Sequence, residues 1–308
     1  MKAFVGVTDF DWFTCLSAIT GLDEVNFWQP SGKSRFQSLK PGEPFLFKLH
    51  SPRNFVVGGG FFAHSTILPV SLAWSAFGGK NGASSLEEMR KRIERYRRSR
   101  QAVEDYNIGC ILLEQPFFFY QNDWISVPED WFPNIVRGKT YDTATGIGKR
   151  LWENVIDRLS RQTRVPNEIT AIREGGRYGS PIIITPRLGQ GSFRIIVTDT
   201  YERRCAITGE RTLPALEAAH IKPFTDSGPN SVRNGILLRS DIHRLFDTGY
   251  VTVTRDYRFD VSRRIKEEFE NGRDYYAMHG RTVRTPVNAA LRPEQNFIKW
   301  HNENVFRG

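Results

Sequence analysis

The chain has 308 residues, enough for two domains, and 25% of them are charged, which is typical of a globular protein. It has no apolar run near the roughly 20 residues of a membrane helix, no signal-peptide pattern at its start and only three scattered cysteines, so a cytoplasmic protein without membrane contact is expected. A formal net charge of +9 favours a polyanionic partner, of which nucleic acid is the commonest inside a cell.

The N-terminal quarter of the chain is predicted to be rich in β-strands. A short apolar run at residues 3–7 precedes a helix over 9–16. Pro41-Gly42 predicts a tight turn, and the alternation of apolar residues over 45–49 indicates a half-buried strand after it. A further strand over 55–62 is expected to be broken by its three glycines.

This pattern resembles the small β-barrel domains of the PUA-like superfamily, which includes the EVE, ASCH, YTH and SRA types. The resemblance rests on Leu-Lys-Pro-Gly-Glu-Pro-Phe-Leu-Phe-Lys at residues 39–48, between a helix and a Gly-rich strand, and covers about residues 1–140. It implies a β-barrel with helices and a pocket that accepts a modified base. Trp28, Phe47 and Trp74 are candidates for the pocket walls, although an aromatic side chain is more often part of the core.

The middle of the chain is predicted to connect this domain to a second one. A basic helix over 86–100 either follows DNA phosphates or forms a solvated face, and a buried strand is expected at 108–113. Residues 134–145 have the composition of a loop, and an amphipathic helix is expected over 146–159. Residues 141–180 are therefore assigned to a linker and helix between the domains.

The remaining residues, 181–308, are predicted to form a second domain around a strand–loop–strand–helix unit, which makes the expected fold class α+β. Residues 216–221 and 236–238 are typical of two short strands, and a helix over 241–247 ends at Gly249.

Three polar residues of this unit stand in or beside apolar runs, where an unpaired polar group is costly. His220 lies on the first strand, Asn234 precedes the second, and His243 lies on the helix. A single histidine at such a position is more often a hydrogen-bonded core residue. Three such residues on successive elements instead favour a functional site.

The order of these residues resembles that of the HNH, or ββα-metal, nuclease family. The matching sequence is Glu-Ala-Ala-His-Ile, then Asn-Gly-Ile-Leu-Leu-Arg, then Asp-Ile-His-Arg-Leu-Phe-Asp, and the resemblance covers about residues 180–265. It implies a metal-dependent DNA endonuclease. In that mechanism His220 takes a proton from the attacking water, Asn234 holds the loop or orients His220, and His243 binds a divalent metal ion.

The predicted metal site has one position that departs from the family pattern. Many members carry Asp or His directly before the general base, where this chain has Ala219. Asp247, one helical turn after His243, is the predicted second ligand, and Glu217 is the alternative. Imidazole and carboxylate together suit Mg²⁺, Mn²⁺ or another transition metal.

Two further predictions concern charge and cysteine near the site. Arg239 and Arg244 are candidates for binding phosphate groups. Cys205 has no cysteine nearby, so no structural zinc is predicted and Cys205 is expected to be a small buried residue.

Together these patterns predict a modification-dependent restriction endonuclease. The N-terminal domain would bind methylated or hydroxymethylated cytosine in double-stranded DNA, and the C-terminal unit would cut nearby. Because two cuts need two nuclease units, a homodimer is expected. Two alternatives stay open: an HNH nuclease without mark specificity, acting in antiphage defence or repair, and a nucleic-acid-binding protein whose HNH unit is structural.

Overall fold

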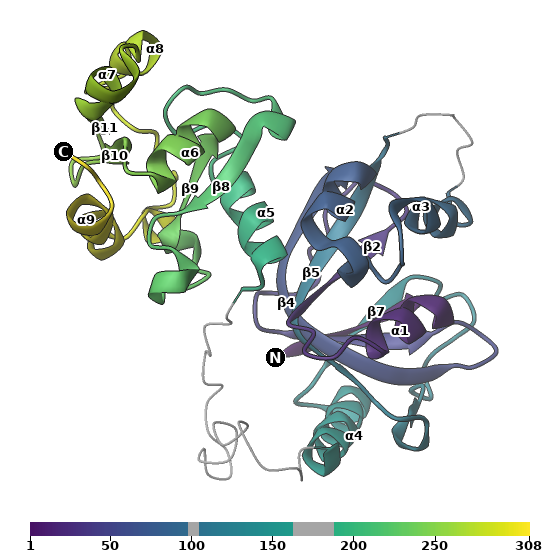
Figure 1. The fold of residues 1–308 in the computed structure, drawn as a ribbon. Coiled ribbons are helices and arrows are strands. Elements are labelled where there is room, and N and C mark those ends of the chain that lie inside the picture. Colours follow the sequence, from purple (N-terminus) through teal and green to yellow (C-terminus); the bar gives the residue numbers. More distant parts are fainter. Residues whose placement is uncertain (98–104, 163–187) are drawn as a thin grey trace. The chain divides into compact units, whose positions relative to one another are not determined.

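The computed structural model of the protein describes residues 1–97, 105–162 and 188–308 (Figure 1). Contacts within the chain divide it into two compact units, residues 1–186 and 187–308. Residues 163–180 of the predicted linker lie outside the described residues. Among the described residues, no helix has the length and apolar composition needed to cross a membrane.

The N-terminal unit is built on one mixed sheet of seven strands, in the order β2-β5-β4-β3-β1-β7, with β6 paired to β4. Strands β1 and β3 are parallel and the other pairs are antiparallel. This path does not return from β7 to β2, so the predicted closed barrel is not shown by the described strands, whereas the α+β class is confirmed. The strands are β1 (Lys2–Thr8), β2 (Glu24–Gln29), β3 (Pro44–Leu49), β4 (Phe55–Pro69), β5 (Asn107–Phe118), β6 (Ile125–Ser126) and β7 (Gly138–Asp142).

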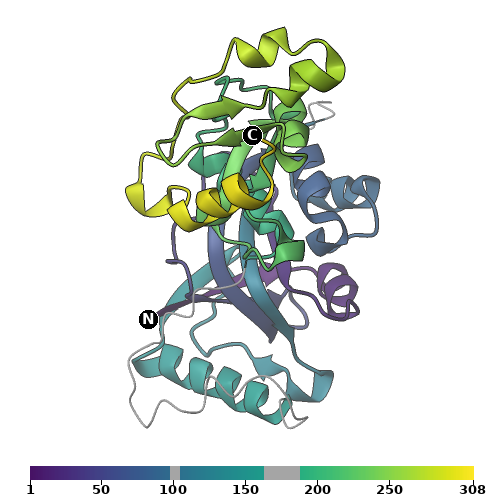
Figure 2. The same ribbon diagram turned by 60° about the vertical axis from the view of Figure 1, so that its left-hand side comes forward.

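Strand β4 corrects one prediction, because its glycines do not interrupt it. The strand continues for 15 residues, with register shifts against β5 between Gly59 and Phe61 and between Phe62 and His64. A Cβ atom at Gly58 would lie 2.2 Å from the Phe117 carbonyl oxygen, and one at Gly59 would lie 2.7 Å from the Phe117 ring. The glycines therefore let two strands approach closely in a sheet that is visibly curved (Figure 2).

The helices of this unit begin and end close to the predicted positions, with one exception. The basic helix α3 ends at Glu94, earlier than predicted, and residues 98–104 lie outside the described part. Its Arg92 is buried, pairs with Glu88 and donates to the Gly82 carbonyl, so it is not part of a solvated face. The helices are α1 (Phe10–Ser17), α2 (Val70–Phe77), α3 (Leu86–Glu94) and α4 (Gly146–Gln162), with short 3₁₀ turns at Gly78–Asn81 and Gln121–Asp123.

The segment predicted to be a loop contains strand β7 instead. β7 pairs with β1 at the sheet edge, where polar residues can face water, and this is why its composition resembled that of a loop. Helix α4 follows, and its Leu151 and Val155 pack in one apolar cluster with Val5 and Leu46 of the sheet. The N-terminal unit therefore continues through α4, beyond residue 140.

A pair of carboxyl groups is buried in this unit. Glu24 of β2 lies directly opposite Glu114 of β5, and both residues are fully buried. Glu24 Oε1 lies 3.0 Å from the Lys80 ammonium, whereas neither carboxyl oxygen of Glu114 has a hydrogen-bond partner among the described residues. Burial, and secondarily the charge of Glu24, raise the pKa of Glu114 to about 7.

The C-terminal unit contains two separate two-stranded sheets, β8-β9 and β10-β11. The predicted strands before and after Asn234 and the helix that follows them are confirmed. Four 3₁₀ turns lie at Leu213–Ala215, Phe224–Asp226, Val232–Asn234 and Ala289–Leu291. The elements are α5 (Gln190–Thr200), β8 (Leu216–His220), β9 (Gly235–Arg239), α6 (Ser240–Asp247), β10 (Val251–Val253), β11 (Phe259–Val261), α7 (Arg264–Phe269), α8 (Arg273–Tyr276) and α9 (Gln295–Asn304).

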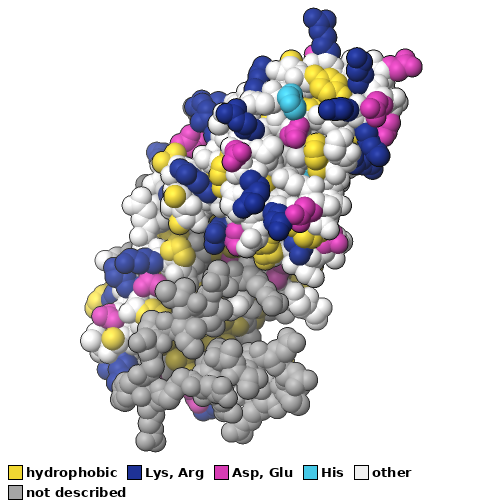
Figure 3. Space-filling model, turned by 90° about the vertical axis from the view of Figure 1, so that its left-hand side faces the viewer, with side chains coloured by type: hydrophobic (Ala, Val, Ile, Leu, Met, Phe, Trp, Pro, Cys, Tyr) yellow, Lys and Arg dark blue, Asp and Glu magenta, His cyan; other side chains and the backbone are white. Residues whose placement is uncertain are grey.

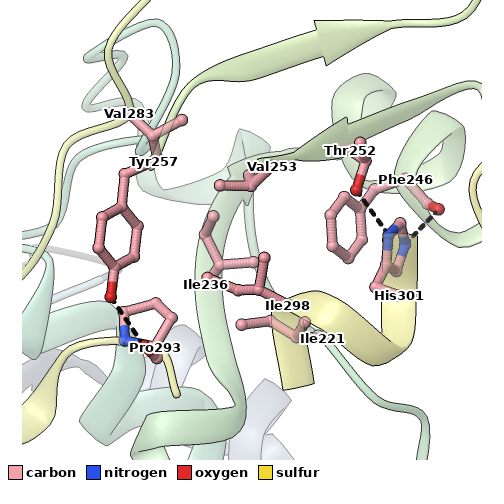
Figure 4. Close-up of a pocket in the computed structure, with 10 residues that line it drawn as sticks. All are labelled: Ile221, Ile236, Phe246, Thr252, Val253, Tyr257, Val283, Pro293, Ile298 and His301. Atoms are coloured by element: carbon pink, nitrogen blue, oxygen red, sulfur yellow. Dashed lines mark hydrogen bonds between the residues drawn. The ribbon is translucent and has the colours of Figure 1, made fainter. Parts of the chain in front are cut away.

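The core of this unit contains a small cavity, shown in Figure 4. Its volume is about 10 Å³, room for roughly one water molecule, and most of its lining is apolar. His301 borders it: Thr252 Oγ1 lies 2.8 Å from Nδ1, and Nε2 donates to the Phe246 carbonyl at 3.1 Å (Figure 4). This cavity is too small for a substrate, and His301 is a hydrogen-bonded core histidine.

Candidate active site

Strands β8 and β9 and helix α6 bring the three predicted polar residues together. The two strands pair from Leu216 opposite Arg239 to His220 opposite Gly235. Helix α6 buries Ile242 and Phe246 in the core, which leaves His243 half-buried on another side of the helix. The helix is amphipathic, and its periodicity separates the core positions from the polar ones.

His220, at the end of β8, is held on two sides. Its ring stacks on the Phe193 ring of α5, with centroids 3.9 Å apart and planes 11° from parallel. Its Nε2 atom lies 2.9 Å from the side-chain oxygen of Asn230. Burial lowers the pKa of His220; the hydrogen bond to Asn230 opposes this effect, and the nearby charge of His243 adds to it. The imidazole is therefore neutral at pH 7, with one nitrogen able to accept a proton.

Asn234 is fully buried and fixes the loop between the two strands. Its side-chain oxygen accepts from the Lys222 amide at 2.9 Å. Its side-chain nitrogen donates to the Lys222 carbonyl at 2.9 Å and to the Pro229 carbonyl at 3.0 Å. One amide group therefore ties together two ends of the loop that follows His220.

His243 lies between two carboxylates. Its Nδ1 is 2.6 Å from Glu217 Oε2, and its Nε2 is 3.3 Å from Asp247 Oδ2. Ala219 is fully buried, on the same face of β8 as Glu217 by strand alternation, so the carboxylate two residues earlier is the one that reaches His243. The pKa of Asp247 is raised, chiefly by loss of hydration, while the charge of His243 opposes the shift.

His243 and Asp247 fit a site for a divalent metal ion. Two donors on adjacent positions of an octahedral ion, each about 2.1 Å from it, lie roughly 3 Å apart, close to the separation seen here. Glu217 on Nδ1 is placed as the carboxylate that orients a metal-binding imidazole. In the described parts of the chain, no group of three or more His, Cys, Asp or Glu side chains is arranged to hold a metal.

The two arginines predicted to bind phosphate have different surroundings. Arg239 forms a two-point ion pair with Asp241, with N–O distances of 2.6 and 2.7 Å, and Tyr275 also donates to Asp241. This pair occupies the Arg239 guanidinium at the start of α6. Arg244 is exposed and adjacent in sequence to His243, so it is the more accessible of the two.

Cys205 is fully buried, as expected. Its sulfur accepts from the Arg239 amide at 3.3 Å and from the Thr208 amide at 3.5 Å. The thiol therefore connects the segment before β8 to the end of β9.

The three candidate walls of a base pocket are placed differently within the N-terminal unit. Phe47 is fully buried in an aromatic core with Trp12 and Phe27. Trp28 is 8% exposed and its indole nitrogen donates to the Asn81 carbonyl. Trp74 of α2 is only partly buried. Of the three, Trp74 is thus the most exposed residue.

Two contacts of the site could not be found in the sequence. Phe193 stands among the apolar positions of a helix, where nothing marks it as a neighbour of His220. Asn230 belongs to a Ser-Gly-Pro-Asn segment that indicates only a turn. Both reach His220 through tertiary folding.

Comparison with known proteins identifies the unit that contains this site. Residues 205–254 match a protein-family model described as HNH endonuclease. Similar solved structures include an ASCH protein from Zymomonas mobilis, at 13% identity over 37% of this chain and 69% of that one, with a TM-score of 0.27. Another is a modification-dependent restriction endonuclease, TagI, at 12% identity over 97% of this chain and 81% of that one, with a TM-score of 0.30.

No curated protein matches the chain. The family match rests on the sequence of residues 205–254. It spans His220, Asn234 and His243, and His243 lies between the Glu217 and Asp247 carboxylates. Residues 205–254 form an HNH endonuclease domain.

Proposed function

We propose that the protein is a metal-dependent endonuclease that cuts double-stranded DNA at or near modified cytosine. The observation that carries the nuclease part is the neutral, half-buried His220 beside the His243–Asp247 pair in an HNH domain. The proposed recognition of modified cytosine rests on the resemblance of the N-terminal region to PUA-like domains. Cutting both strands would require two copies of the nuclease unit, so we include a homodimer in the proposal.

In the proposed hydrolysis, each residue of the site has a separate role. His220 takes a proton from the attacking water, and Asn234 keeps the loop after it in place. Glu217 orients His243, and His243 with Asp247 holds the ion. A divalent ion held there would supply stabilisation of the negative charge on the scissile phosphate and the leaving oxygen. Arg244 binds phosphate, and other basic side chains assist it; Figure 3 shows Lys and Arg scattered over the described part of one face, with Asp and Glu between them.

The metal requirement can be tested with the two carboxylates beside His243. Chelation with EDTA should abolish cleavage, and Mn²⁺ or Mg²⁺ should restore it. Asp247→Asn and Glu217→Gln should each raise the metal concentration for half-maximal cleavage by about 10- to 100-fold, because one removes a charged ligand and the other an orienting carboxylate. Asp256→Asn, at an exposed turn of the same unit, is the matched control. Unchanged metal dependence in Asp247→Asn would contradict this ligand assignment.

The reading of a mark is tested with DNA duplexes of one sequence that contain cytosine, 5-methylcytosine or 5-hydroxymethylcytosine. We expect cleavage of at least one modified duplex and at least tenfold slower cleavage of the unmodified one, which corresponds to about 1.4 kcal/mol of discrimination. Equal rates on all three would remove the mark from the proposal.

A nuclease without mark specificity is the second candidate. It is favoured by the burial of Phe47 and Trp28, which removes two of three candidate pocket walls from the surface. Equal cleavage of the three duplexes would support it. Metal-dependent cleavage of any of them would exclude the third possibility, a binding protein with a structural HNH unit.

A further inference from the structure

The loop between β8 and β9 places a second amide side chain against the proposed general base. Asn230 lies ten residues after His220 and is half-buried. Its side-chain oxygen lies 2.9 Å from His220 Nε2. The Phe193 ring, stacked on the face of the His220 imidazole, is the second constraint. The imidazole can therefore neither tilt nor turn without losing one of the two contacts.

This contact selects one form of the neutral imidazole. An amide oxygen can only accept a hydrogen bond, so Nε2 must carry the hydrogen that it donates. The other nitrogen, Nδ1, then holds the lone pair. Which nitrogen of a histidine carries the proton is generally set by the partner of the other nitrogen.

We propose that Asn230 is a positioning residue that holds His220 in the Nε2–H form, so that Nδ1 takes the proton from the attacking water. In that step an O–H bond of water breaks and its proton moves to Nδ1, while the water oxygen bonds to phosphorus. The bond from phosphorus to the leaving oxygen then breaks, and that oxygen takes a proton from solvent. The side-chain oxygen of Asn230 keeps its hydrogen bond throughout, because Nε2–H is present in both the neutral and the charged imidazole.

Asn230 can act in this way because its own backbone is fixed. The Pro229 carbonyl accepts from the Asn234 side chain at 3.0 Å and from the Ser231 amide at 2.8 Å. Gly228 donates to the Pro223 carbonyl at 2.9 Å, and a Cβ atom on it would lie 1.9 Å from the Lys222 carbonyl oxygen. Asn234 therefore holds the loop that presents Asn230, and Asn230 holds His220.

The first test reads the tautomer directly and needs no substrate. Long-range ¹H–¹⁵N NMR spectra of the full chain should show His220 with hydrogen on Nε2, assigned by comparison with His220→Ala. Asn230→Ala should lose this preference, and Thr225→Ala, in the same loop, should retain it. Hydrogen on Nδ1 in the unaltered protein would overturn the inference.

The second test is cleavage of the duplexes that the unaltered protein cuts. Asn230→Ala should lower kcat by about 10- to 100-fold with little change in KM, the range expected when the partner that orients a functional histidine is lost. Asn230→Asp should restore part of kcat and move the acid limb of the pH profile to higher pH, because a carboxylate stabilises the imidazolium. A loss confined to thermal stability, with both pH profiles unchanged, would assign Asn230 a structural role and overturn the inference.

This inference rests on the proposed role of His220, and the two can fail separately. Full activity of His220→Ala removes the proposed function. An inactive His220→Ala beside a fully active Asn230→Ala removes only the role of Asn230.

Discussion

Replacing His220 by alanine should lower the rate of DNA cleavage by about 10²- to 10⁴-fold, the range that a positioned general base contributes. The methyl group of alanine cannot take a proton from water, whereas the proposed metal ligands His243 and Asp247 are left in place. Single-turnover cleavage with saturating metal ion measures the loss without interference from product release.

The exposed His279 supplies the matched control, since its side chain is 56% exposed and lies outside the site. His279→Ala should cleave at the unaltered rate. The pH profile adds a second readout. Because the pKa of His220 is lowered, cleavage should be constant through neutral pH and fall only below the ordinary histidine value, as His220 gains a proton. A rate in His220→Ala within threefold of the unaltered protein would show that another group serves as the base.

The second large effect is expected on stability, from Glu114→Gln. The pKa of Glu114 is raised from 4.5 to about 7, so the folded protein retains a proton there that the unfolded chain releases. Its folded state therefore binds more protons than the unfolded state between these values, and stability falls as pH rises through this window. The loss amounts to about 3 kcal/mol at pH 8, and it is absent below pH 4.5.

Glutamine has nearly the same shape and cannot ionise, so Glu114→Gln should remove this pH dependence. Urea unfolding should show the variant gaining stability over the unaltered protein at pH 8 and not at pH 5. Glu153→Gln, an exposed position on α4, should change neither value by more than about 0.5 kcal/mol. Parallel pH dependence in the Glu114→Gln variant and the unaltered protein would place the responsible group elsewhere.

The ββα unit could be predicted from the sequence because its signals are local. Residues 216–221 and 236–238 alternate or run apolar over strand-length windows, and the helix after them has clear ends. The positions of His220 and His243 on these elements then follow from the chain itself.

The contacts that complete the site are not local, and they could not be predicted. Glu217 reaches His243 across the space between a strand and a helix, and from the sequence alone it is only an alternative ligand. Asn230 lies in a segment whose composition indicates only a turn. In the N-terminal unit, β7 has the composition of a loop because it is an edge strand, and the Glu24–Glu114 pair depends on the register of β2 and β5.

Helix α6 supplies both core residues and candidate site residues within its eight positions. Ile242 and Phe246 anchor it in the core, while His243 and Asp247 lie on a neighbouring face, 3.3 Å apart, as the proposed metal ligands. Inserting or deleting one residue in this helix rotates all later positions by about 100°, so it would exchange apolar and ligand positions together. The same eight residues therefore carry both the core contacts of the helix and the proposed metal ligands. Changes in the length of this helix should be tolerated less well than changes in the length of any loop around it.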